Sequence, residues 1–137
     1  MPATRSAERT EFLTDVFTTA MEGGVSYWAS VLEYRHTESP RAVLVHTEEL
    51  ILDHETMSWV PGPDAEELIV DLDVVARGIS RIVKGEVDYL PETHRARIAA
   101  ASRENDMMPA NGRHGDIDAG IAEHVVQAAL FGAIVHG

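Results

Sequence analysis

Ala128-Ala129-Leu130-Phe131-Gly132-Ala133-Ile134-Val135 is a run without one polar side chain, and it closes a segment that opens with Asp116-Ile117-Asp118. A helix that is apolar on every side must be enclosed by protein, because an apolar face in water carries a free-energy cost. Chain ends usually fray. We nevertheless predict that the helix in residues 116–137 lies at the centre of the core or of a subunit interface.

A second helical pattern runs from Ser6 to about Arg35, where apolar residues recur every three or four positions. Gly23 and Gly24 interrupt it, at a cost of roughly 2 kcal/mol relative to alanines. We predict one long helix, kinked at the glycines, with Gly24 on a face that another helix approaches closely. Two helices joined at a glycine corner are the alternative. The recurring residues are Phe12, Leu13, Val16, Phe17, Ala20, Met21, Tyr27, Trp28, Val31 and Leu32.

The middle of the chain predicts a small antiparallel meander. Its strands are expected at 41–47, 50–52 and 57–60, with 68–70 completing the sheet. A helix over 72–84 follows, capped by Asp71 or Asp73, and Gly78 within its apolar face again indicates close helix packing. Residues 86–115 are expected to be an irregular, mobile insert with one helix candidate over 92–103.

These elements together predict an α+β fold in a single domain, residues 1–137. A small antiparallel sheet of two to four strands packs with three or four helices, and the N- and C-terminal helices form the core. The two apolar terminal helices offer more apolar surface than one small core absorbs, so we also expect a homodimer.

The composition excludes several classes of function. The chain has 23 Asp and Glu against 11 Lys and Arg, a formal net charge of −12. Affinity for DNA, RNA or anionic lipid requires clustered Lys and Arg, so we expect neither direct nucleic-acid binding nor membrane binding. A mimic of DNA phosphates stays an alternative to the simpler role of surplus acid in solubility. There is no Cys, and Met1–Arg5 lack the apolar core of a signal peptide, so we expect a cytoplasmic protein.

Three stretches resemble a known pattern. Met21-Glu22-Gly23-Gly24-Val25-Ser26-Tyr27-Trp28 is similar to a Leu-Glu-Gly-Gly-Ile-x-Tyr-Trp signature, and Asp71 with Gly78-Ile79 to a short middle motif. Residues 116–119, 125–132 and 135–137 resemble a terminal motif. Together they resemble small uncharacterised proteins of actinobacteria, their plasmids and their bacteriophages. The resemblance implies a mobile-element accessory protein in the host cytoplasm and carries no named activity. His124, Ala133 and His136 depart from it, where an acid, Glu and Tyr are expected.

The best candidate ligand site combines Glu22, Tyr27, Trp28 and Gln127. An acid beside glycines with aromatic residues one or two turns away can form a pocket that stacks a planar ligand. Gln127 lies among apolar residues, so we expect it to be buried and hydrogen-bonded, to Glu22 or to Asp118. The simpler interpretation is that the aromatic residues belong to the core.

A weaker candidate is a metal site at Asp116 and Asp118, with Glu123, His114 and His124 nearby. Carboxylates two residues apart beside an imidazole can bind a divalent cation. The spacing fails the EF-hand template, and acids at a helix N-terminus have a simpler role as caps. We therefore expect no metal and no cofactor.

The function expected first is that of a non-enzymatic, acidic interaction protein that acts on a host protein. The alternative is a small-ligand-binding protein with its pocket near Glu22, Tyr27, Trp28 and Gln127. The third is a metal-dependent hydrolase at Asp116 and Asp118.

Overall fold

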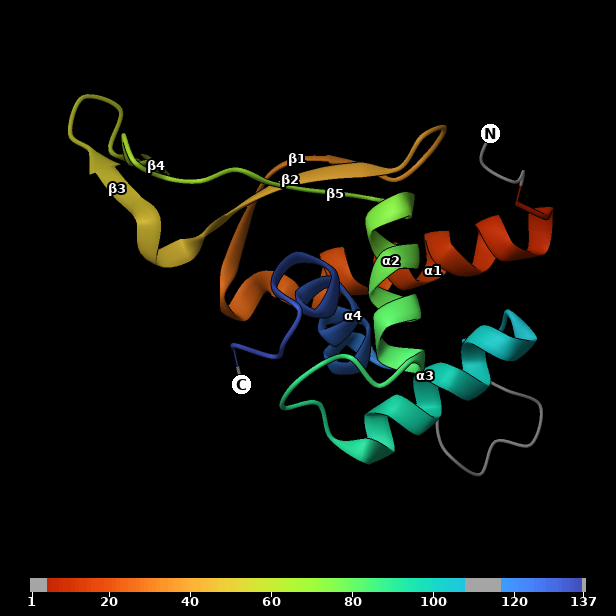
Figure 1. Ribbon diagram of the computed structural model, residues 1–137. Coiled ribbons are helices and arrows are strands. Elements are labelled where there is room, and N and C mark those ends of the chain that lie inside the picture. The colour runs from red at the N-terminus through yellow and green to blue at the C-terminus, as the bar shows by residue number, and fades with distance from the viewer. Residues whose placement is uncertain (1–4, 108–116, 137) are drawn as a thin grey trace.

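The protein has an α+β fold, seen in a computed structural model that describes residues 5–107 and 117–136. The helices lie on one side of a small antiparallel sheet, and a two-stranded arm projects beyond it (Figure 1). The elements are α1 (Ala7–Gly23), η1 (Val25–Tyr27), β1 (Ala29–Arg35), β2 (Arg41–His46), η2 (Thr47–Glu49), β3 (Leu50–Asp53), β4 (Ser58–Pro61), β5 (Leu68–Asp71), α2 (Leu72–Val83), α3 (Glu92–Glu104) and α4 (Ala119–Phe131).

The predicted long helix over residues 6–35 is wrong, and so is its alternative of two helices. The α-helix ends at Gly23, the amide of Gly24 bonds to the carbonyl of Ala20, and residues 29–35 form β1. The apolar residues at 27, 28, 31 and 32 have helical spacing, but they are aromatic or branched and therefore also suit a strand. Backbone pairing of β1 with β2 makes residues 29–35 a strand. The glycine position of the break was predicted correctly.

The sheet has the order β1-β2-β5, with antiparallel neighbours throughout. Its central strand β2 buries Ala42, Val43, Leu44 and Val45, which explains its run of consecutive apolar residues. The four predicted strands are present. The single meander is wrong, because β3 and β4 pair only with each other and form the arm.

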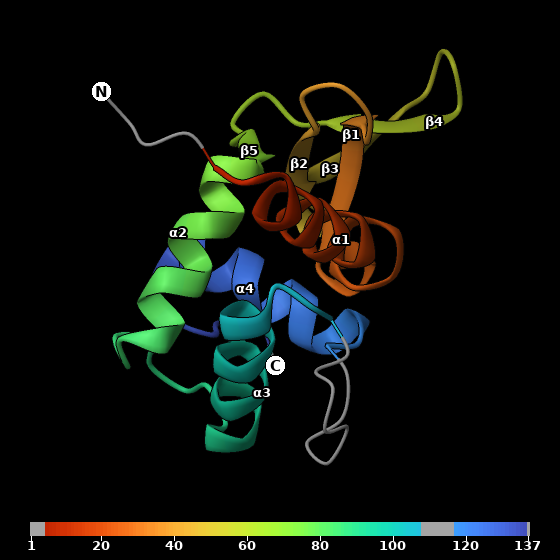
Figure 2. The same ribbon diagram turned by 90° about the vertical axis from the view of Figure 1, so that its right-hand side faces the viewer.

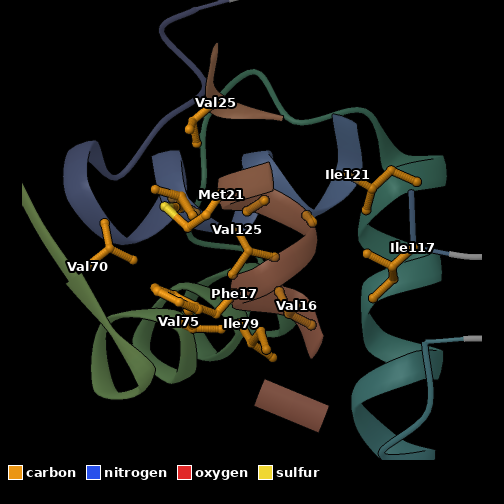
Figure 3. Packing of buried hydrophobic residues seen from close by; sticks show 14 of the residues in the cluster. Val16, Phe17, Met21, Val25, Val70, Val75, Ile79, Ile117, Ile121 and Val125 are labelled. Carbon is orange, nitrogen blue, oxygen red and sulfur yellow. The ribbon is translucent and has the colours of Figure 1, made fainter. Parts of the chain in front are cut away.

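The prediction that the C-terminal helix lies in the core is confirmed for α4. Six of its apolar residues are no more than 3% exposed: Ile121, Ala122, Val125, Val126, Ala128 and Ala129. The two polar residues Glu123 and Gln127 of the same helix are 0% exposed. Figures 1 and 2 place α4 against α1 and α2. Figure 3 shows how α1, α2, β5 and α4 contribute side chains to one cluster.

Glycines on α1 and α2 permit this packing. A Cβ at Gly24 would lie 2.5 Å from the carbonyl oxygen of Ala119, and one at Gly78 would lie 2.2 Å from that of Val125. The helices therefore contact α4 at distances that no larger residue allows. Both close approaches were predicted from the glycines.

The apolar run ends differently from the prediction. The helix stops at Phe131, because Gly132 adopts a left-handed conformation (φ 72°) and caps it. Residues 132–136, called the C-terminal tail below, leave the helix, and Val135 is 55% exposed. The amide of Ile134 in this tail bonds to the carbonyl of Asp88 at 2.9 Å.

Residues 86–115, expected to be irregular, contain α3, which agrees with the helix candidate over 92–103. Ile98 and Ala101 of α3 belong to the core. Residues 108–116 lie outside the described part of the chain, so the expectation of a mobile insert stays a prediction there. None of the helices in the described residues is long and apolar enough to cross a membrane.

Candidate functional site

A polar centre lies inside the fold, formed by Tyr27, Trp28, Glu123 and Gln127. The indole Nε1 of Trp28 donates to Oε1 of Glu123 at 2.8 Å, and the amide nitrogen of Gln127 donates to the same oxygen. The hydroxyl of Tyr27 lies 3.0 Å from Oε2 of Glu123. Glu123 and Gln127 are fully buried, so this carboxyl group has exchanged water for three protein partners.

Gln127 joins the polar centre to the C-terminal tail. Its side-chain oxygen accepts from the amides of Val135 and His136, each at 2.9 Å. Its nitrogen donates to the His136 carbonyl at 3.0 Å. The hydroxyl of Tyr27 lies 2.8 Å from that same carbonyl. These four hydrogen bonds hold the tail through the backbone of its last described residues.

Local sequence explains why these groups meet. Asp118 caps α4 by accepting from the amide of Ile121 at 2.9 Å, which sets the start of the helix. Glu123 and Gln127 are four residues apart and therefore lie on one face of α4. A Cβ at Gly24 would lie only 2.7 Å from the Cβ of Glu123, so this glycine lets the end of α1 approach the carboxyl group.

Burial raises the pKa of Glu123 above its ordinary value of 4.5, against the opposing effect of hydrogen bonds from Gln127, Trp28 and Tyr27. The Tyr27 hydroxyl has one proton and two acceptors, Oε2 of Glu123 and the carbonyl of His136. Burial, followed by the charge of Glu123, raises the pKa of Tyr27 to about 12. Burial therefore disfavours the charged form of each residue.

Of the predicted ligand site, the structure brings together Tyr27, Trp28 and Gln127 but not Glu22. Glu22 is exposed on α1, and its Oε2 accepts from the hydroxyl of Tyr34 at 2.5 Å. The acid that completes the centre is Glu123, which the sequence analysis had placed in the metal candidate. Its spacing of four from Gln127 was the available signal. The burial of Gln127 is as predicted, but its partner is neither Glu22 nor Asp118.

A pocket of about 370 Å³ opens beside the polar centre. Trp28 forms one wall and is stacked on the ring of His136, with centroids 4.7 Å apart and planes 5° apart. His46 lies close by, with its Nε2 3.1 Å from that of His136. From the sequence, His136 stood out only as a departure from the resemblance, and nothing paired it with His46, which is 90 residues away. The lining residues are Tyr27, Trp28, His46, Thr47, Glu48 and His136.

The weak metal candidates do not converge within the described residues. Asp118 is the cap of α4, which is the simpler role considered for it, and Asp116 and His114 lie outside the described part. His124 lies with its Nε2 3.8 Å from the buried Glu123. Across residues 5–107 and 117–136, no three His, Asp or Glu side chains are arranged to hold a metal ion.

The β3–β4 arm, residues 50–61, is the other feature with functional character. Leu52 pairs with Trp59 and Ile51 with Val60, so the two pairs lie on opposite faces of the ribbon. Trp59 is 66% exposed and Ile51 is 49% exposed, and the core of the described residues includes no part of the arm.

Acidic residues surround the arm. Residues 47–67 contain no Lys or Arg and carry seven carboxylates, at positions 48, 49, 53, 55, 64, 66 and 67. A hollow of about 460 Å³ lies at the base of the arm. It is lined by Glu48, Glu49, Ile51, Gly62, Pro63, Asp64, Ala65 and Glu66.

Comparisons of the chain with protein-family models, with curated proteins and with solved structures gave no match.

Proposed function

We propose that this chain is a non-enzymatic binding protein that holds a basic segment of another protein on its β3–β4 arm. The observation that carries the proposal is the exposure of Trp59 and Ile51 on a ribbon within residues 47–67, a segment with seven carboxylates and no Lys or Arg. Large exposed apolar side chains bordered by polar groups are typical of interaction surfaces. The resemblance to phage and plasmid proteins suggests that the partner is a host protein.

The arm is poorly explained as an isolated structural element. A two-stranded ribbon is marginally stable in water without a surface to pack on. Each of its strands also has one edge with unpaired backbone groups, and an extended segment of a partner can pair with such an edge. Exposed Trp is moreover the residue type most often found as an energetic anchor of interfaces.

The acidic charge of residues 47–67 determines which kind of partner segment binds. The hollow beside Ile51 is lined by Glu48, Glu49, Asp64 and Glu66, so it suits the cationic end of an Arg or Lys side chain. Neighbouring apolar residues of the partner then pack on the arm. Attraction by seven carboxylates accelerates the encounter and excludes acidic segments.

Selection from a displayed library of random peptides tests the proposal. We expect the wild-type chain to enrich peptides that combine Arg or Lys with apolar residues. Trp59→Ser, and separately the triple substitution Glu48→Gln, Asp64→Asn and Glu66→Gln, should each weaken a selected peptide by at least about tenfold, the effect of losing one anchor.

Matched controls separate the arm from general effects of charge and apolar exposure. Tyr89→Ser removes a more exposed aromatic residue (85%) away from the arm, and Glu8→Gln with Glu11→Gln and Glu104→Gln removes three other surface charges. Neither control should weaken the affinity for the peptide by more than the small electrostatic effect of a lower net negative charge. Enrichment without basic residues, or binding that survives both arm variants, contradicts the proposal.

The predicted small-ligand site is supported less strongly. In the described residues, every buried side-chain nitrogen and oxygen already has a hydrogen-bond partner within the protein. The polar centre therefore has no free buried group that would favour a ligand, and it accounts well for the position of the tail.

A further inference from the structure

Two histidines from distant parts of the chain face each other at the pocket beside the polar centre. His46 is the last residue of β2, and His136 lies in the C-terminal tail. Their Nε2 atoms are 3.1 Å apart, and the rings are inclined by 49°. A tetrahedral Zn²⁺ bound to two imidazole nitrogens at about 2.0–2.1 Å separates those nitrogens by about 3.3 Å. The pair thus has nearly the spacing of two ligands of one ion.

The other nitrogen of His46 faces a carboxylate. Its Nδ1 lies 3.2 Å from Oε1 of Glu49 in η2. A carboxylate in this position favours the tautomer with the proton on Nδ1, which leaves the lone pair of Nε2 available to a metal ion. Metal-binding histidines usually have such a partner on the nitrogen that does not bind the metal, which fixes the ring and increases its basicity.

His136 is also held in position before any ion arrives. Its ring is stacked on Trp28, and its backbone is bonded to Gln127 through both the amide and the carbonyl. Two fixed ligands lose little conformational entropy on binding.

We propose that His46 and His136 bind a divalent late transition-metal ion, of the Zn²⁺ class, through their Nε2 atoms. Water from the adjoining pocket completes the coordination. Imidazole nitrogen suits Zn²⁺, Ni²⁺ and Cu²⁺, whereas Mg²⁺ and Ca²⁺ prefer oxygen. This metal site is separate from the proposed partner binding, and its metal affinity is measured on the protein without any partner.

Titration calorimetry of the chelator-treated protein, carrying no affinity tag, with Zn²⁺ alone is the first test. We expect one ion per chain. His46→Gln and His136→Gln should each weaken binding by at least about 100-fold, the upper end of what the loss of an outer-shell partner costs, and Glu49→Gln by about 10- to 100-fold. His54→Gln removes an exposed histidine in the arm turn and should leave the affinity unchanged.

Nitrogen-15 spectra of the wild-type imidazole rings give a second readout that needs no variant to fold. One equivalent of Zn²⁺ should shift Nε2 of His46 and of His136, whereas the exposed rings of His36 and His54 should not change. The proposal is overturned if millimolar Zn²⁺ gives no ring shift, or if the Nε2 proton of His136 persists at saturation. The latter result identifies the pair as a simple hydrogen bond. Affinity retained in both histidine variants also overturns it.

Discussion

The indole nitrogen of Trp28 and the carboxyl oxygen Oε1 of Glu123 are 2.8 Å apart in the interior, although 95 residues separate them in sequence. This bond connects the residue that leads into β1 with the middle of α4. Through Gln127, four residues further along α4, it extends to the tail. One buried acid therefore ties together the turn after α1, the central helix and the end of the described chain.

The buried acid predicts a specific pH dependence of stability. Because burial raises the pKa of Glu123 above 4.5, the folded chain binds more protons than the unfolded chain between 4.5 and the folded pKa. The free energy of unfolding falls as pH rises through this window, by at most about 1.4 kcal/mol per pH unit for one proton. The contribution is complete below pH 4.5. Glu123→Gln keeps the shape and removes the titrating group, so it should lose this slope.

Urea unfolding of both proteins, from pH 4.5 up to neutrality, measures the effect as a difference between two curves. Changes in other titrating groups cancel in that difference. The stability of Glu123→Gln relative to the wild type should therefore increase steadily with pH. Parallel curves would falsify the idea that Glu123 is more readily protonated in the folded state.

Gln127 predicts where the tail is anchored. In Gln127→Met the amides of Val135 and His136 lose their common acceptor, so their hydrogen exchange should become faster. The lost bonds should lower the free energy of unfolding by about 1–3 kcal/mol. The amide of Ile134 is an internal control, because it bonds to Asp88 rather than to Gln127. Equal acceleration at all three amides would show that the tail loosens as a unit.

Part of the polar centre was predictable. Gln127 lies among apolar neighbours, and that pattern alone indicates a buried amide that needs partners. The choice of acid failed, because proximity in sequence favoured Glu22 while the three-dimensional contact belongs to Glu123. A spacing of four on one helix was the more reliable signal. The pairing of His46 with His136 had no signal at all, because it depends on where two distant segments end.

For the fold as well, features set by neighbouring residues were predictable, and features set by contacts between distant segments were not. Glycines in the helical faces correctly predicted close packing, since a missing Cβ has few other uses in a helix. Residues 29–35 were assigned to a helix because their apolar spacing suits both structures. Only the backbone hydrogen bonds from these residues to β2 distinguish a strand from a helix here. The end of α4 depends on the left-handed conformation of Gly132. The sequence alone could not show whether this glycine ends the helix or continues it as another buried residue.

Gly78 should be the most sensitive of the packing positions. Gly78→Ala places a methyl group where the Val125 carbonyl oxygen lies 2.2 Å away, so α2 or α4 must shift. We expect a loss of about 3 kcal/mol in the free energy of unfolding, measured by urea denaturation. Gly120→Ala is the matched control. It lies in α4 with only a 3.5 Å contact to Asp118, and should gain up to about 1 kcal/mol from helix propensity. A neutral Gly78→Ala would contradict the close approach.

The two tryptophans should differ strongly in solution. Trp28 is 5% exposed and Trp59 is 66% exposed. Acrylamide should therefore quench the fluorescence of Trp28→Phe, which retains Trp59, almost as efficiently as free indole. Trp59→Phe, which retains Trp28, should be well protected. Trp28→Phe also loses the bond to Glu123 and should be less stable by about 1–3 kcal/mol, whereas Trp59→Phe should stay within about 0.5 kcal/mol of the wild type.

The same quenching experiment tests whether a second copy of the chain covers the arm. If a second copy covers the arm, Trp59 will be shielded at high protein concentration and become accessible on dilution, because association follows mass action. If the arm is free for a basic partner, quenching of Trp59 will be independent of concentration, and only the added peptide will protect it. A Trp59 that is shielded at every dilution, in a chain that sediments as a monomer, contradicts the exposed arm itself.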